Sequence, residues 1–178
     1  MSVMNEQRVN VDSATYPFLA HATPRPGQLE MIQDGIKALE RGGFHLAAAP
    51  TGIGKTAASL ASALEVASQS PQKKTVFFLT SRQTQHRIVV DTVRRINQRR
   101  QGMMPVRLVD MVGQAGMCVQ PFAKESPLVF SLLCSQARKT RSCKPWITSA
   151  PGLKERILAH PLHVDELVDI SRTHTCHL

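Results

Sequence analysis

The segment at residues 49–56, Ala-Pro-Thr-Gly-Ile-Gly-Lys-Thr, constrains this chain more than any other feature of its sequence. A loop that wraps phosphate groups must turn its backbone N–H groups inward, and Gly52 and Gly54 permit this because they have no side chains. Lys55 is placed to contact the β and γ phosphates and Thr56 to ligate Mg²⁺, so these two are the candidate catalytic residues. The segment predicts ATP and Mg²⁺ as cofactors. The candidate nucleotide contacts within it are Ala49, Pro50, Thr51, Gly52, Ile53, Gly54, Lys55 and Thr56.

Apolar runs and helical patterns alternate around this loop. The apolar segments at residues 44–49, 75–80 and 106–109 have the length and composition of buried parallel strands. Apolar residues recur at helical spacing over residues 28–41, 55–68 and 83–100. This order predicts an α/β fold in which right-handed crossovers join the strands of a parallel sheet.

The composition is that of a globular chain with a basic surface. Lysine and arginine number 22 against 13 aspartate and glutamate residues, which gives a formal net charge of +9. This positive field favours polyanions as partners, although many basic proteins are merely soluble. No apolar run reaches the length of a membrane span, and the start of the chain lacks the apolar core of a secretory signal. We therefore expect no membrane partner and an intracellular location, cytoplasmic in a prokaryote or nuclear in a eukaryote.

All the cysteines lie in the last third of the chain. Cys118, Cys134, Cys143 and Cys176 contain no C-x2-C pair, so their spacing alone matches neither a zinc ribbon nor a ferredoxin. In a reducing compartment a metal site is favoured over disulfides. His174 and His177 flank Cys176 and leave a mixed Cys/His zinc site open.

The change in pattern after Gly113 indicates a boundary between two parts. We expect a leader at residues 1–24, a nucleotide-binding part at residues 25–112 and a small, mostly helical metal-binding domain at residues 113–178. Helices are predicted in the last part at residues 153–159 and 164–171.

Polar side chains outside the loop are further candidates. The Gln28 amide, at the start of the first expected helix, can pair with an adenine edge or simply begin the helix. Tyr16 and Phe18 can stack on a base or pack inside the chain. Arg82 and Gln85 follow the second expected strand, at the sheet edge that binds ligands, and are candidate DNA phosphate contacts; a capping loop with a solvated arginine is the alternative. A solvated helix face is the interpretation for Arg94, Arg95, Arg99 and Arg100.

Four segments together resemble the XPD family of DNA helicases, which includes DinG and FancJ. They are Pro24-Arg-Pro-Gly-Gln28, the loop at residues 49–56, residues 80–85, and Gly116-Met117-Cys118 at the start of the cysteine set. The resemblance covers about residues 16–178. It implies a partial RecA-like motor lobe with a parallel sheet, joined to a [4Fe–4S] domain, in enzymes of DNA repair that use ATP to unwind DNA 5′ to 3′.

The resemblance also implies a role for each candidate residue. Gln28 would read adenine, while Arg82 and Gln85 would contact single-stranded or forked DNA. The cluster ligands would be Cys118, Cys134, Cys143 and Cys176.

The chain departs from the family pattern after the fourth cysteine. The family has a strand ending in Asp-Glu-x-His, whereas Asp165-Glu166-Leu167-Val168 follows no apolar strand, precedes no histidine and predicts the first turn of a helix. The chain is therefore expected to be an amino-terminal part of a helicase that neither hydrolyses ATP nor unwinds DNA by itself. Two alternatives stay open: a non-catalytic nucleic-acid or protein interaction module, and an unrelated P-loop ATPase with a structural zinc.

Overall fold

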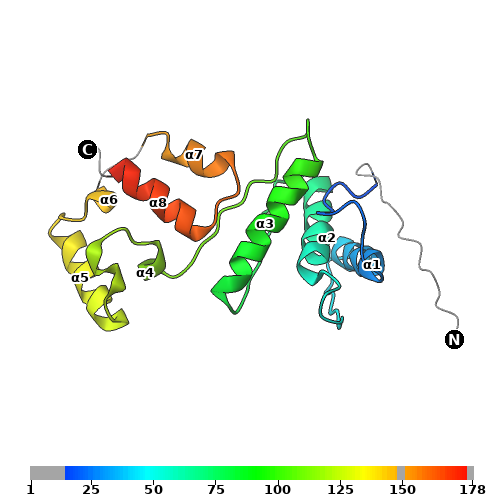
Figure 1. Cartoon of the computed structure of the whole chain (residues 1–178), viewed down its shortest axis with the longest axis horizontal. Coiled ribbons are helices and arrows are strands. Elements are labelled where there is room, and N and C mark those ends of the chain that lie inside the picture. The colour runs from blue at the N-terminus through cyan, green and yellow to red at the C-terminus, as the bar shows by residue number, and fades with distance from the viewer. Residues whose placement is uncertain (1–14, 148–150, 176–178) are drawn as a thin grey trace, which may run out of the picture. The chain divides into compact units, whose positions relative to one another are not determined.

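The computed structural model describes residues 15–147 and 151–175 of the 178-residue chain. It divides into two compact units, Met1–Val106 and Arg107–Leu178. Helices joined by extended segments make up the described part of both units (Figure 1). The first unit contains α1 (Gln28–Glu40), α2 (Lys55–Gln69) and α3 (Gln83–Arg99). The second contains α4 (Gln114–Met117), the 3₁₀ helix η1 (Pro121–Lys124), α5 (Pro127–Lys139), α6 (Lys144–Ile147), α7 (Leu153–Ala159) and α8 (Val164–Thr175).

The helices expected from apolar spacing are confirmed. α1, α2 and α3 occupy the three segments predicted before Gly113, and α7 and α8 occupy the two predicted after it. Asp165 and Glu166 lie in the first turn of α8, as expected from the missing strand before them. Within the described residues, no helix combines the length and the apolar character that crossing a membrane requires.

The prediction of an α/β fold is wrong for the part of the chain that the structure describes. No β-strand is present there, so the parallel sheet of a RecA-like lobe is not formed. The backbone pairing of β type is an isolated parallel bridge between Val109 and Leu162, in the second unit. Residues 44–49, 75–80 and 106–109 run between helices without forming a ladder.

The apolar runs fail as strands because composition favours an extended backbone but does not supply a neighbour. A ladder needs a second strand about 4.8 Å away whose carbonyls accept the N–H groups. The two segments of the first unit instead leave large side chains in solvent: Phe44 is 100% exposed, Leu46 99%, Phe77 82% and Leu79 87%. Side-chain burial alternates along residues 75–80, as expected for an extended chain with one face covered.

The first unit is held together where α1 crosses α2. Gly35 of α1 lies against Ser62 of α2, and a Cβ atom at position 35 would lie 2.7 Å from the Ser62 Oγ. The Ser62 hydroxyl is buried and lies 3.2 Å from the Ile32 carbonyl oxygen and 3.0 Å from that of Ala58. Glycine therefore permits the close approach, and the hydroxyl is satisfied within it.

Part of the leader packs into this unit through arginines of α3. Phe18 and Leu19 are buried, the Arg99 guanidinium donates to the Leu19 carbonyl at 3.1 Å, and the Arg100 guanidinium lies 3.9 Å from the centre of the Phe18 ring. Burial is the first cause that lowers the pKa of Arg100. Arg99 and Arg100 are thus structural, which corrects their interpretation as part of a solvated face. Tyr16 accepts a hydrogen bond from Gln33 at 2.7 Å, so both leader aromatics make contacts inside the unit.

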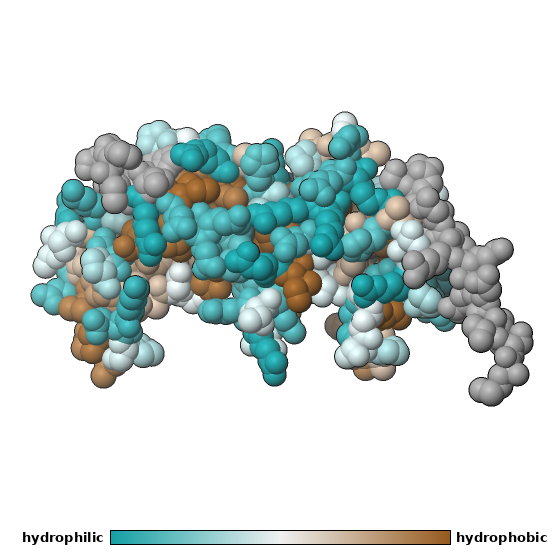
Figure 2. All heavy atoms as spheres, in the orientation of Figure 1, coloured by the Kyte–Doolittle hydropathy of each residue, from teal (hydrophilic) through white to brown (hydrophobic). Residues whose placement is uncertain are grey.

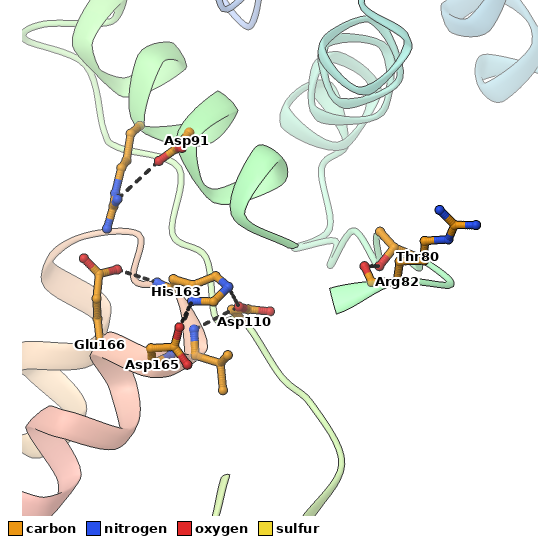
Figure 3. A network of polar contacts seen from close by, with 9 residues as sticks. Thr80, Arg82, Asp91, Asp110, His163, Asp165 and Glu166 are labelled. Carbon is orange, nitrogen blue, oxygen red and sulfur yellow. Dashed lines mark hydrogen bonds and ion pairs between the residues drawn. The ribbon is translucent and has the colours of Figure 1, made fainter. Parts of the chain in front are cut away.

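The second unit ties the segment after Val106 to the start of α8 through a buried polar network (Figure 3). The Asp110 carboxylate accepts the Val164 N–H at 2.9 Å and lies 3.8 Å from Nε2 of His163. The other ring nitrogen of His163 lies 3.2 Å from the Asp165 carboxylate. Glu166 accepts the backbone N–H of His163 at 2.7 Å, which is the reciprocal half of a capping box. The network satisfies polar groups at the first turn of α8.

Candidate nucleotide-binding site

A cleft of about 1350 Å³ opens in the first unit beside the phosphate loop. Residues 21–29 of the leader and α1 form one wall, and the loop with the first turn of α2 forms another. Of the predicted nucleotide contacts, Gln28, Thr51, Gly52, Gly54, Lys55 and Thr56 line the cleft. Ala49, Pro50 and Ile53 belong to the same loop but are not among its lining residues.

The loop has the backbone geometry that phosphate binding requires. Gly52 has φ 92° and Gly54 has φ 85°, a conformation that side chains disfavour. Gly54 is also the N-cap of α2, whose first turn contains no acidic residue. The positive end of the α2 dipole and the turned backbone are therefore presented to the cleft, and both favour an anion.

The Lys55 ammonium is held over the loop by two carbonyl groups. It donates to Ala49 at 3.0 Å and to Pro50 at 2.9 Å, and the side chain is exposed. These contacts position the charge next to the turned backbone. An ammonium has three N–H groups, so one remains for a phosphate oxygen without loss of either carbonyl contact.

Gln28 and Arg25 brace the loop from the leader side. The Gln28 side chain is 3% exposed; its amide donates to the Gly54 carbonyl at 3.2 Å and accepts the Arg25 N–H at 3.1 Å. The Arg25 guanidinium donates to the Gly52 carbonyl. Both carbonyls belong to the glycines with positive φ, so the leader fixes the two sharpest turns of the loop. Gln28 as an adenine contact stays a prediction.

Basic side chains surround the cleft. His21, Arg25, Lys55 and Arg95 line it, and its lining residues include no aspartate or glutamate. The Arg95 guanidinium lies 3.2 Å from Nε2 of His21. Because arginine only donates, this contact requires a neutral imidazole that accepts at Nε2. Desolvation, followed by the charges of Arg95, Arg25 and Arg99, lowers the pKa of His21 below its usual 6.5.

A family comparison agrees with this site. The model described as the type III restriction enzyme, res subunit (ResIII), matches residues 21–109, which is half of the chain. The chain belongs to the ResIII family. The match supports a helicase-type region of superfamily 2 with an ATPase-like amino-terminal part, and it does not select the XPD family within that class. No curated protein and no solved structure gives a significant match.

The ResIII match covers every residue of the cleft, including three that the sequence analysis did not select. These are His21, Arg25 and Arg95. Arg25 stands three residues before Gln28, and Arg95 stands four before Arg99 on the same face of α3. Neither spacing identifies a ligand contact without the folded leader between them.

The predicted DNA contacts of this ResIII region lie away from the cleft. Arg82 is the N-cap of α3, and its carbonyl accepts the Thr80 hydroxyl at 3.1 Å and the Gln85 N–H at 3.0 Å (Figure 3). The side chains of Arg82 and Gln85 are both exposed. The arrangement includes the capping loop that was the alternative interpretation, and a DNA role for the two side chains stays a prediction.

The cysteines lie beyond the ResIII match, in the second unit. Cys118, Cys134 and Cys143 are free and partly exposed; Gln114 donates to the Cys134 sulfur at 3.6 Å and Gln120 to the Cys143 sulfur at 3.7 Å. Among the described residues, no three cysteine, histidine or acidic side chains form a group able to hold a metal ion. Cys176 and His177 lie outside the described residues, as does the side chain of His174. The described thiols thus do not fit a [4Fe–4S] cluster, which stays a prediction from the resemblance, and iron and sulfide analysis of anaerobically purified protein tests it.

Binding of a polyphosphate in the cleft is expected to take up a proton at His21. A bound polyanion offsets the arginine charges that lower the pKa of His21, so the imidazole gains affinity for a proton when the cleft is filled. Affinity for ATP should therefore rise as the pH falls from about 8 to about 5, and more steeply in the wild type than in His21→Gln. Calorimetry in buffers of different ionisation enthalpy measures the proton uptake, and the variant removes the contribution of the nucleotide's own titration. Equal pH slopes for the two proteins would contradict the assignment.

Proposed function

We propose that this chain binds Mg²⁺-ATP in the cleft of its first unit and acts as the nucleotide-binding part of an ATP-dependent helicase of superfamily 2. The observation that carries the proposal is the loop itself. Two left-handed glycines, a helix N-terminus and Lys55 converge on one cleft that basic side chains line. Membership of the ResIII family supports the same class of activity.

Each group has a chemical task in this proposal. The loop backbone and the α2 dipole bind the phosphate oxygens, while Lys55 and Arg95 offset their negative charge. Thr56 lines the cleft next to Lys55 and would hold Mg²⁺, which supplies charge stabilisation to the β and γ phosphates. Arg25 and Gln28 act one step away, because they fix the loop carbonyls and thereby the direction of its N–H groups.

Titration calorimetry tests the proposal. Mg²⁺-ATP and inorganic tripolyphosphate should both bind and compete for one site, because the observed groups recognise phosphate. Adenosine alone should bind far more weakly. No binding of ATP or tripolyphosphate would refute the assignment of the cleft, whereas tight binding of adenosine alone would show that the base is the main determinant.

Single-stranded or forked DNA is the proposed partner, through Arg82 and Gln85 and the net positive charge. Arg82→Ala should weaken binding of a fluorescent single strand similarly for different base sequences and lower the salt dependence by about one released ion, because a phosphate contact carries no base information. Arg41→Ala is the matched control, since it removes an exposed charge from the same unit at the end of α1. Fluorescence anisotropy measures both effects. Equal losses for the two variants would reduce the role of Arg82 to net charge.

The finer implications of the XPD resemblance go beyond these observations. The 5′ to 3′ direction, the role in DNA repair and the iron–sulfur cluster are predictions that the resemblance alone supports. The competing interpretations predict different outcomes: a non-catalytic interaction module binds DNA without binding ATP, and a P-loop ATPase with structural zinc yields zinc and no acid-labile sulfide.

A further inference from the structure

Helix α5 of the second unit exposes an apolar stripe. Leu128 is 72% exposed, Leu132 63%, Val129 39% and Leu133 37%. The spacing of four residues within each pair places all of them on one side of the helix. Figure 2 shows hydrophobic surface at the edge of the molecule where Figure 1 places α5.

The opposite side of α5 fixes which way the stripe faces. Phe130 is the buried residue of the helix, and its ring lies 6.0 Å from that of Phe122 in η1. This contact anchors α5 to its own unit, so the stripe points outward. A stripe of this width and composition is typical of the contact face between two helices.

The charges at the two ends of the stripe are complementary. Glu125 precedes the N-cap of α5, and Lys139 ends the helix; each lies seven residues from Leu132, about two helical turns. Both side chains are exposed. When two copies of α5 pair in opposite directions about Leu132, Glu125 of each copy meets Lys139 of the other. The two helix dipoles also oppose one another in that arrangement.

The distribution of basic residues excludes the parallel arrangement. Arg138 and Lys139 crowd the C-terminal turn of α5, and Arg141 follows it. Parallel pairing would bring both clusters together. Antiparallel pairing separates the two Lys139 positions by about 20 Å along the helix axis, which is beyond the screening length of about 8 Å at physiological salt.

We propose that α5 is a self-association surface, on which a second copy of this chain docks through an antiparallel α5–α5 contact with two-fold symmetry. Leu132 lies at the symmetry axis and faces its own counterpart. Leu128 of one copy faces Gln136 of the other, and Glu125 pairs with Lys139 at each end. Such an isologous contact closes on itself and yields a dimer rather than a filament.

Sedimentation equilibrium of the whole chain tests the proposal. We expect a reversible species of twice the 19.6 kDa chain mass. The double variant Leu128→Gln, Leu132→Gln should raise the dissociation constant of the dimer by at least roughly tenfold, as expected for the loss of central apolar contacts. Both residues are exposed, so circular dichroism should show unchanged helix content. A wild type that is monomeric at every accessible concentration would overturn the proposal.

A matched control separates α5 from other exposed apolar residues. Leu46→Gln with Leu79→Gln removes two leucines that are more exposed, from extended segments of the first unit. This variant should dimerise like the wild type. If it becomes monomeric while the α5 variant does not, the interface lies elsewhere and the proposal fails.

Charge exchange and cross-linking test the direction of the pair. Glu125→Lys and Lys139→Glu should each weaken the dimer, and the two together should restore it, because the exchanged charges again meet. Leu132→Cys should give, on mild oxidation, a covalent dimer in which peptide mapping links position 132 to itself. Failure of the double exchange to recover the dimer, or a disulfide that avoids position 132, would rule out this register.

Discussion

Lys55→Ala is expected to weaken binding of Mg²⁺-ATP by roughly 10², a loss of about 2.7 kcal/mol. The ammonium lies within hydrogen-bond distance of two loop carbonyls and next to the turned backbone of Gly52 and Gly54. Charge-assisted contacts to phosphate are among the strongest that a side chain makes, so their loss exceeds that of a neutral hydrogen bond. The side chain is exposed, and its removal should leave the helix content unchanged. Titration calorimetry measures the affinity.

Two companion variants define what the Lys55 result means. Lys37→Ala removes the same charge from α1, where the ammonium lies 3.8 Å from Asp34 and outside the cleft. Its affinity for ATP should match the wild type, because exposed charges at a distance are screened. Lys55→Arg keeps the charge but changes the geometry and should recover only part of the affinity. If Lys37→Ala weakens ATP binding as much as Lys55→Ala does, general charge rather than the loop governs binding.

The helices were predictable because their signals are local. Ile32 of α1, Leu60 of α2 and Val93 of α3 are buried, as their apolar spacing predicts. The positions of Gly42-Gly43 and of the loop glycines also marked where α1 ends and α2 begins. A helix satisfies its backbone within its own segment, so the same residues that give the pattern also complete the structure.

The sheet was not predictable from the same kind of signal. Residues 44–49 and 75–80 have strand composition and extended backbones, but their pairing depends on residues far away in sequence. In the described part of the chain no such pairing forms, and Phe44 and Phe77 remain exposed. Strand propensity measures how well a side chain fits a sheet that already exists.

The candidate site divides in the same way. The loop was predictable because glycine, lysine and threonine at fixed spacing have one mechanical interpretation. The leader residues were not, since His21 and Arg95 lie 74 positions apart and meet only through the packing of Phe18 and Leu19 beneath them. Arg99 and Arg100 carried a correct charge signal but the wrong environment. Their long side chains reach the leader rather than solvent.

Two loop glycines with nearly the same backbone conformation should respond differently to alanine. At Gly52, φ is 92° and a Cβ would meet nothing within 4 Å; at Gly54, φ is 85° and a Cβ would lie 2.5 Å from the buried Gln28 amide nitrogen. Gly52→Ala should therefore lower the free energy of unfolding by about 1 kcal/mol, the conformational cost alone. Gly54→Ala adds a collision with a side chain that cannot move freely, for a total of roughly 2–4 kcal/mol.

A double-mutant cycle isolates the collision at Gly54. In a Gln28→Ala background the new methyl group meets no amide, so the effect of Gly54→Ala should fall to that of Gly52→Ala, about 1 kcal/mol. Urea denaturation followed by far-ultraviolet circular dichroism gives the four free energies of the cycle. The same coupling should appear in ATP affinity, because Gln28 holds the Gly54 carbonyl and hence the direction of the loop N–H groups. An effect of Gly54→Ala that is equally large with and without Gln28 would show that the backbone conformation, and not the brace from the leader, determines the shape of the phosphate loop.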